Sequence, residues 1–243
     1  MGARGATIVV AVALAAGVVS MSAEGYPTRA DRSPQHLRFT TTPARLSSTD
    51  PTPVTMRISD EYRTGEEDAA GPLRVLPIEG DREIVLDLEG VPVCDGLGRD
   101  IRRDLDEMER LCGDAAIGHG RIEFGAFFPG DRWILFSSRM TLYNLGPGPG
   151  GPELFAFAYF TAPVTAALRI PVELRRLDRG PFGWEARASI PKIIGGKGEI
   201  TEYALRIDRR FLSATCSRRK LELRVVSGFF DRPAHREKAA HAC

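Results

Sequence analysis

The chain has 243 residues, of which 43% are hydrophobic, and its formal net charge at pH 7 is only +1. This length and hydrophobic content allow one large or two small domains with a real core. The charge balance excludes binding by bulk charge. Proteins that bind nucleic acid or anionic membranes usually carry a basic surplus or a basic block, and neither occurs here. We therefore expect no nucleic-acid partner.

The first element in chain order is an uninterrupted apolar stretch from Thr7 to Val19, preceded by Arg4 and followed by small residues up to Ser22. A positive residue, a short apolar core and small residues before the cut are typical of a secretory signal, which predicts a signal peptide over residues 1–22. A membrane anchor would need about 20 apolar residues, and Glu24 ends the run too early. We expect no stable membrane span after cleavage, and a secreted or extracytoplasmic protein whose attachment to the cell surface stays open.

Residues 23–52 are rich in Thr, Ser, Pro and Arg and lack apolar periodicity, which predicts a flexible lead-in. A single folded domain is then expected over residues 53–243. Val54, Met56 and Ile58 alternate with polar residues, the period of a half-buried strand. The mainly acidic run after it, residues 61–70, is predicted to be a loop.

The next segment predicts a hairpin and then the one convincing helix. Strands are expected over residues 73–78 and 84–88, with Gly80-Asp81 as the turn signal between them. The helix is expected over residues 100–111, because Ile101, Leu105, Met108 and Leu111 recur at helical spacing and charges fill the other face.

Strand patterns separated by turns fill most of the remaining chain. They are expected over residues 117–128, 133–143, 153–160, 167–176, 184–190, 199–207, 212–216 and 221–229. Short strands joined by turns rather than by helices point to antiparallel sheets. The predicted fold is all-β with one short helix, closed as an Ig-like or jelly-roll-like β-sandwich; the alternative closure is a β-barrel. Residues 231–243 are predicted to be a polar tail.

The chain has four cysteines: Cys94, Cys112, Cys216 and Cys243. In an exported chain we expect them to form disulfides, because an oxidising compartment favours disulfides over free thiols. Four cysteines allow three pairings. Locality favours Cys94 with Cys112, around the helix, and Cys216 with Cys243, at the chain end. Each bridge would close a loop for which chain entropy suggests roughly 3 kcal/mol. Close Cys-x2-Cys pairs are absent, so no zinc site or other metal site is expected.

Two glycine-rich runs could in principle form binding sites. Gly195-Gly196-Lys197-Gly198 lacks the helix that a phosphate-binding loop requires, so a hairpin turn is favoured. The run from Gly146 to Pro152 is expected to be a turn; a bland spacer is favoured over a mobile binding loop, which stays the alternative.

No catalytic or cofactor-binding residue is singled out. Carboxylates suited to glycoside hydrolysis cluster at Glu66, Glu67 and Asp68, and on the helix at Asp104, Asp106, Glu107 and Glu109, where solvated charges are expected anyway. His119 is the one histidine placed beside a predicted strand where a base could be held. Phe155 and Phe157, like Trp133 and Trp184, suit either core packing, which is favoured, or a platform for sugar rings.

Four segments together resemble a family of uncharacterised exported β-rich proteins from GC-rich bacteria. They are Leu88-Glu89-Gly90-Val91-Pro92-Val93-Cys94, the stretch from Cys112 to Gly120, the stretch from Ile190 to Gly198, and Ser213-Ala214-Thr215-Cys216 with a last cysteine. The resemblance covers roughly residues 52–243. It implies a secreted β-rich domain with the same cysteine pairs, and it brings no activity or ligand.

The sequence thus predicts a non-catalytic exported domain that binds an envelope component or a glycan, or serves as a structural module of the cell envelope. The alternatives are a carboxylate-based extracellular hydrolase and a carbohydrate-binding module. No cofactor is implied.

Overall fold

The computed structural model describes residues 35–62, 71–95, 104–128, 132–162 and 165–243. All of them belong to one compact unit, Pro34–Cys243. The predicted signal peptide, the lead-in up to residue 34 and the candidate acids Glu66, Glu67 and Asp68 lie outside the described residues. Within the described ranges, no helix is long and apolar enough to cross a membrane.

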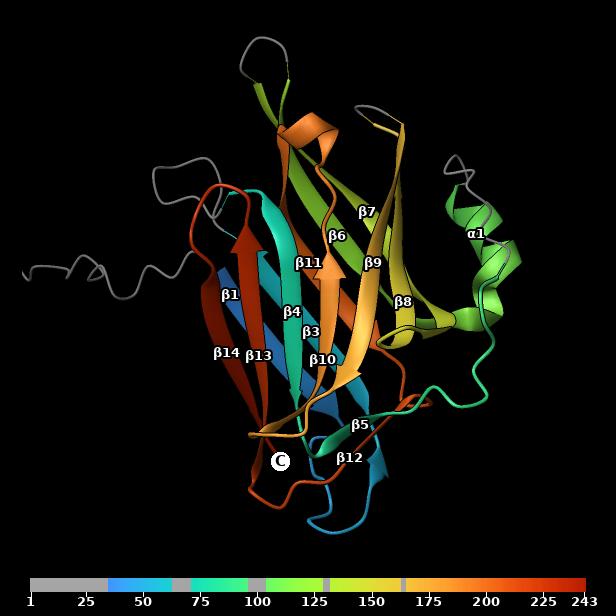
Figure 1. Cartoon of the computed structure of the whole chain (residues 1–243), viewed down its shortest axis with the longest axis vertical. Coiled ribbons are helices and arrows are strands. Elements are labelled where there is room, and N and C mark those ends of the chain that lie inside the picture. Colours follow the sequence, from blue (N-terminus) through green and yellow to red (C-terminus); the bar gives the residue numbers. More distant parts are fainter. Residues whose placement is uncertain (1–34, 63–70, 96–103, 129–131, 163–164) are drawn as a thin grey trace, which may run out of the picture. The chain divides into compact units, whose positions relative to one another are not determined.

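The unit is built almost entirely of antiparallel strands (Figure 1). The strands are β1 (Gln35–Thr42), β2 (Thr52–Pro53), β3 (Thr55–Tyr62), β4 (Leu73–Asp81), β5 (Ile84–Leu86), β6 (Ala116–Phe128), β7 (Arg132–Gly148), β8 (Gly151–Phe160), β9 (Ala166–Arg176), β10 (Phe182–Ser189), β11 (Gly198–Ile207), β12 (Leu212–Ala214), β13 (Lys220–Phe229) and β14 (His235–Ala242). The helices are α1 (Leu105–Cys112) and two short 3-10 turns, η2 (Gly113–Ala115) and η3 (Ile194–Gly196). The predicted all-β fold with one short helix is confirmed.

Eleven strands form one sheet in the order β1-β3-β11-β6-β7-β8-β9-β10-β4-β13-β14, and β2-β12-β5 form a small sheet at one end (Figure 1). The first and last strands of the large sheet meet. The rings of Phe39 on β1 and His241 on β14 lie 6.2 Å apart, centroid to centroid, and Ser227 on β13 donates a hydrogen bond to Gln35 on β1 over 2.9 Å. The large sheet therefore nearly closes on itself. The observed closure therefore corresponds to the predicted alternative, a β-barrel, and not to a sandwich of two sheets packed face to face.

The core fills the inside of this barrel, because alternate residues of each strand point inward. On β9, Ile170, Val172 and Leu174 are buried while the residues between them are exposed or partly exposed. On β3, Met56 and Ile58 are buried as their alternation predicted. Each strand thus contributes one apolar side to a shared interior.

The helix α1 lies outside the barrel, next to β7 and β8 (Figure 1). The Asp104 carboxylate caps it by accepting a hydrogen bond from the backbone N–H of Glu107 over 2.8 Å. Met108 and Cys112 are buried against aromatic residues of the barrel wall. Leu111, expected on the buried face, is 49% exposed, because Cys112 takes the inward position. The predicted residues 100–103 lie outside the described part.

Both predicted disulfides are present. Cys94 is bonded to Cys112, with their Cα atoms 5.0 Å apart, and Cys216 is bonded to Cys243, with Cα atoms 6.3 Å apart. The first ties the segment after β5 to the end of α1. The second ties the segment after β12 to the chain end. Two disulfides indicate an oxidising, extracytoplasmic environment.

Two segments that composition marked as irregular are strands. The predicted flexible lead-in over residues 23–52 contains β1, so the folded part includes residues from Gln35 onward. The predicted polar tail over residues 231–243 contains β14, which pairs with β13 from Lys220↔Ala242 to Ser227↔His235. Their polar composition hid them, because each is an end strand of the sheet with a solvated outer side.

The predicted hairpin between residues 73–78 and 84–88 is wrong. The strand β4 runs on through Gly80 and Asp81 and pairs with β10 and β13. The chain then turns at Arg82 and Glu83, and β5 leaves the large sheet to pair with β12. The Asp81 carboxylate explains the longer strand, because it is buried and accepts hydrogen bonds from Arg218 over 2.7 and 2.8 Å.

Candidate functional site

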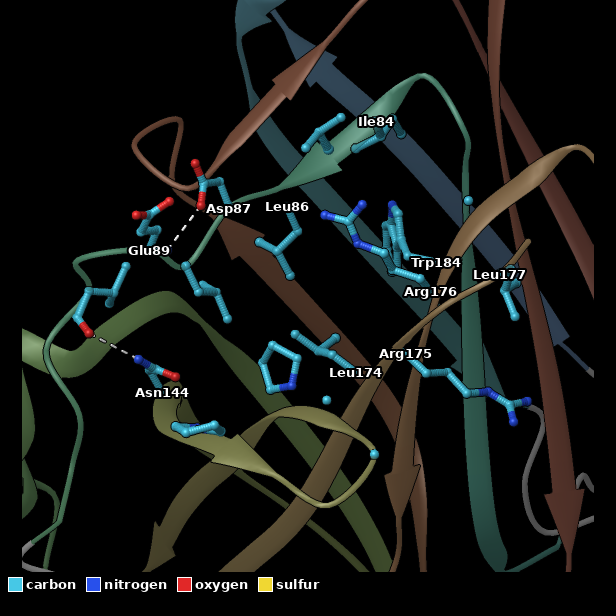
Figure 2. Close-up of a pocket in the computed structure, with 18 of the residues that line it drawn as sticks. Ile84, Leu86, Asp87, Glu89, Asn144, Leu174, Arg175, Arg176, Leu177 and Trp184 are labelled. Carbon is cyan, nitrogen blue, oxygen red and sulfur yellow. Dashed lines mark hydrogen bonds between the residues drawn. The ribbon is translucent and has the colours of Figure 1, made fainter. Parts of the chain in front are cut away.

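An open pocket of about 850 Å³ lies where β5 and the segment after it, the β7–β8 hairpin and the β9–β10 hairpin come together (Figure 2). These segments are far apart in the sequence, and the barrel brings their ends to one mouth. Pockets for small molecules typically have volumes of about 300–1,000 Å³. The mouth of this barrel therefore has the size of a ligand-binding site.

The floor of the pocket is apolar and borders the barrel interior. Leu86, Leu174 and Trp184 line the pocket, and they also line a second, smaller cavity of about 90 Å³ that is surrounded by apolar and aromatic core side chains. These three side chains separate the open mouth from the core. An apolar group that enters the mouth would meet hydrocarbon at the floor.

Trp184 is held against the neighbouring strand by a glycine. Trp184 on β10 is paired in register with Gly80 on β4, and a Cβ atom at Gly80 would overlap the indole ring of Trp184. Only glycine lets the ring lie this close to the strand backbone. Gly80, which the sequence suggested as part of a turn, therefore positions a floor residue of the pocket.

The glycine- and proline-rich run from Gly146 to Pro152 forms one wall. It was expected as a turn or spacer, but Gly146–Gly148 belongs to β7 and Gly151–Pro152 to β8, so only Pro149-Gly150 turns the chain. The buried Asn144 fixes this wall. Its side-chain amide donates to the carbonyl oxygens of Val91 and Pro92 over 3.2 and 3.1 Å, and its oxygen accepts from the backbone N–H of Gly146 over 3.0 Å.

Two apolar side chains of the pocket wall face solvent. Val85 on β5 is 47% exposed and Val93 in the following segment is 45% exposed, and both line the pocket. Val93 also packs against the backbone at Gly146. Exposed apolar side chains gathered in a concave site are a common mark of a binding surface.

The three arginines that line the pocket differ in their hydrogen bonds and ion pairs. Arg82 donates to the backbone carbonyls of Leu177, Gly180 and Phe182 over 3.0–3.3 Å, which fixes the β9–β10 turn. Arg175 pairs with Glu185 over 2.8 Å. Among the residues that the structure describes, the Arg176 side chain has no hydrogen bond or ion pair.

The residues weighed for catalysis do not meet at the pocket. His119 is exposed on β6, with no hydrogen bond to its side chain within the described ranges. Asp104 caps α1, and Asp106 faces Arg139 at 3.9 Å. None of these three lines the pocket.

The remaining aromatic, glycine-rich and metal-ligand candidates also lie away from the pocket. Phe155 and Phe157 are buried beneath α1, which confirms core packing and leaves them unavailable as a platform for sugar rings. Gly195–Gly198 forms a tight turn closed by the single Ile193↔Gly198 bridge. It is not the predicted hairpin turn, because β10 and β11, the strands on either side, do not pair. No group of three or more His, Cys, Asp or Glu side chains suited to a metal ion occurs in the part of the chain described.

A buried polar cluster closes the barrel seam, away from the pocket. We call Gln35, Asp60, Tyr62 and Ser227 the seam cluster. One oxygen of the Asp60 carboxylate, Oδ2, accepts hydrogen bonds from the Gln35 amide and from the Tyr62 hydroxyl, the latter over 2.9 Å. The Tyr62 hydroxyl lies 3.2 Å from that of Ser227. Burial raises the pKa of Asp60 from 3.8 to about 7, against the opposing effect of these hydrogen bonds.

No protein-family model, no curated protein and no solved structure matches this chain. The resemblance to an exported bacterial family therefore stays a prediction. Function has to be inferred from the pocket itself.

Proposed function

We propose that the protein is a non-catalytic, extracytoplasmic binding module that holds a small, largely apolar molecule at the mouth of its barrel. One observation carries the proposal. An open pocket of about 850 Å³ has a floor whose side chains, Leu86, Leu174 and Trp184, also border the apolar barrel interior. Removing apolar ligand surface from water at such a floor is favourable by about 25 cal/mol per Å².

The pocket favours an apolar molecule over a glycan. Val85, Val93 and a run of glycine and proline in its lining offer little side-chain hydrogen bonding. Charged side chains line it as well, but Arg82 is bonded to loop carbonyls and Arg175 to Glu185. Phe155 and Phe157, which a sugar platform would need at the surface, are buried, and the Trp184 ring is packed against the backbone of β4 at Gly80. The predicted signal peptide and the two disulfides support a site of action in the cell envelope or outside the cell.

Binding of Nile red, a neutral apolar dye, tests this proposal. We expect saturable binding to the disulfide-bonded protein, and about a tenfold or greater loss of affinity in Val85→Asp, because a ligand at that wall would have to desolvate the new carboxylate. Fluorescence titration measures both affinities.

Leu111→Asp is the matched control. Leu111 is 49% exposed, close to the 47% of Val85, but it lies on α1 outside the pocket. This variant is expected to bind Nile red as the wild type does, and thermal melts establish that both variants fold. Equal affinities of Val85→Asp and wild type, or the absence of saturable binding, would contradict the proposal.

A further inference from the structure

The inward-facing side of β9 changes character at the pocket. Ile170, Val172 and Leu174 are buried and line the interior cavity, and Arg176, the next residue on the same side of the strand, stands at the pocket instead. Arg176 is paired in register with Trp184. An apolar surface thus ends in a single guanidinium at the place where the barrel opens.

Of the three arginines that line the pocket, Arg176 alone has no hydrogen bond or ion pair with the described residues. Figure 2 shows its side chain beside Trp184, extending toward Leu86, while Arg175 points away from the pocket centre. Arg175 is neutralised by Glu185, and Arg82 is engaged with loop carbonyls. Among the described residues, no carboxylate forms an ion pair or a hydrogen bond with Arg176.

The acidic residues at the rim do not compensate this charge. Asp87 and Glu89 follow β5, and the Asp87 carboxylate accepts the backbone N–H of Glu89 over 2.9 Å, within the turn that they form. Figure 2 places both on the far side of Leu86 from Arg176. Asp178 also lines the pocket, two residues after Arg176 in the β9–β10 turn, but it is exposed, and among the described residues no ion pair joins the two side chains. The guanidinium therefore extends toward the apolar floor without a carboxylate partner (Figure 2).

From this arrangement we infer that the pocket takes an amphipathic anion, whose apolar chain lies on the floor of Leu86, Leu174 and Trp184 and whose carboxylate or similar head is bound by Arg176. This inference rests on the proposed function and names the ligand class of that pocket. A guanidinium presents two parallel donors to a carboxylate, and such charge-assisted hydrogen bonds are stronger than neutral ones.

Displacement of Nile red by three ten-carbon probes tests the inference: decanoate, decanol and decylamine. The wild type is expected to bind decanoate about tenfold more tightly than decanol, and decylamine most weakly. Arg176→Gln should remove the advantage of decanoate and leave the affinity for decanol unchanged. Arg179→Gln, an exposed neighbour that does not line the pocket, is the matched control and should behave as wild type.

The outcomes separate the two proposals. Equal binding of decanoate and decanol, tighter binding of decylamine, or an equal loss of both in Arg176→Gln would overturn the anion preference while apolar binding stands. Failure of Nile red and all three probes to bind the wild type would overturn the proposed function itself.

Discussion

Asp60→Asn is expected to stabilise the protein at pH 8 by up to about 4 kcal/mol and to leave its stability at pH 4 nearly unchanged. The carboxyl group is fully buried, and its pKa is raised from 3.8 to about 7, mainly by desolvation. The difference of about three pKa units, at about 1.36 kcal/mol each, sets the upper limit. Asparagine imitates the neutral carboxyl and can still accept from Gln35 and Tyr62.

The direction of the pH dependence follows from how many protons the Asp60 carboxyl binds in the folded and in the unfolded chain. Below about pH 4 the carboxyl is protonated in both the folded and the unfolded chain. Between about pH 4 and pH 7 the unfolded chain releases the proton while the folded protein keeps it, so the free energy of unfolding falls as the pH rises through this range. The charge of Glu237 adds to the effect by opposing ionisation of Asp60. Tyr62 and Tyr203 stay neutral, because burial raises their pKa values well above 10.0.

Urea unfolding of wild type and variant at pH 4, 5, 6, 7 and 8 measures this difference directly. Glu61→Gln is the matched control, since Glu61 is the next residue on β3 and faces solvent; this variant removes a carboxylate from the same strand and leaves the buried Asp60 in place. A constant difference for Asp60→Asn across the same range would show that burial does not hold its proton.

Replacing Cys216 and Cys243 together by serine is expected to lower the free energy of unfolding by about 3–4 kcal/mol. The bridge spans a sequence separation of 27 residues, and the chain-entropy model gives this magnitude for such a loop. Loss of the bridge should also loosen β14 locally, in addition to lowering the global stability. No residue of β14 is fully buried, so the strand depends on its backbone pairing with β13 and on the bridge at its end.

Hydrogen exchange separates the local effect from the global one. Amides of β14 should lose protection in the variant under native conditions, before the rest of the barrel opens. The matched control removes the other bridge, Cys94 with Cys112, which closes a separation of 18 residues outside the barrel. It should cost about 3 kcal/mol and leave β14 protected. Unchanged exchange of β14 after loss of its own bridge would refute this role.

The strands with an apolar side could be predicted from the sequence, and so could both disulfides. Met56 and Ile58 on β3 alternate with polar residues, and this local pattern needs no knowledge of the partner strand. The end strands β1 and β14 were missed because their inward sides carry polar groups, buried on β1 and half-buried on β14. Gln35 on β1 is buried only because Asp60 and Ser227 satisfy its amide, which no local pattern reveals.

The wrong hairpin has a similar cause. Gly80 and Asp81 are a turn signal by residue type, but here Gly80 makes room for the Trp184 ring and Asp81 binds Arg218. Both functions depend on residues more than a hundred positions away along the chain. A turn signal is local, and these long-range contacts override it.

The pocket was the part least accessible to sequence reasoning. Its floor joins Leu86, Leu174 and Trp184, which come together only through the strand order and register of the barrel. One local signal existed, since Ile170, Val172, Leu174 and Arg176 form a two-residue period in which a cation follows three apolar residues. The pattern marks the end of a buried surface, but its meaning depends on the neighbouring strands.

Quenching of Trp184 tests most directly whether the barrel mouth binds an apolar ligand. The chain has two tryptophans, so Trp133→Phe leaves Trp184 as the sole indole, and a bromine-labelled decanol quenches indole fluorescence on contact. We predict saturable quenching in Trp133→Phe, with no comparable quenching of Trp133 in Trp184→Phe. The absence of quenching in Trp133→Phe, or equal quenching in both variants, would contradict binding at this pocket.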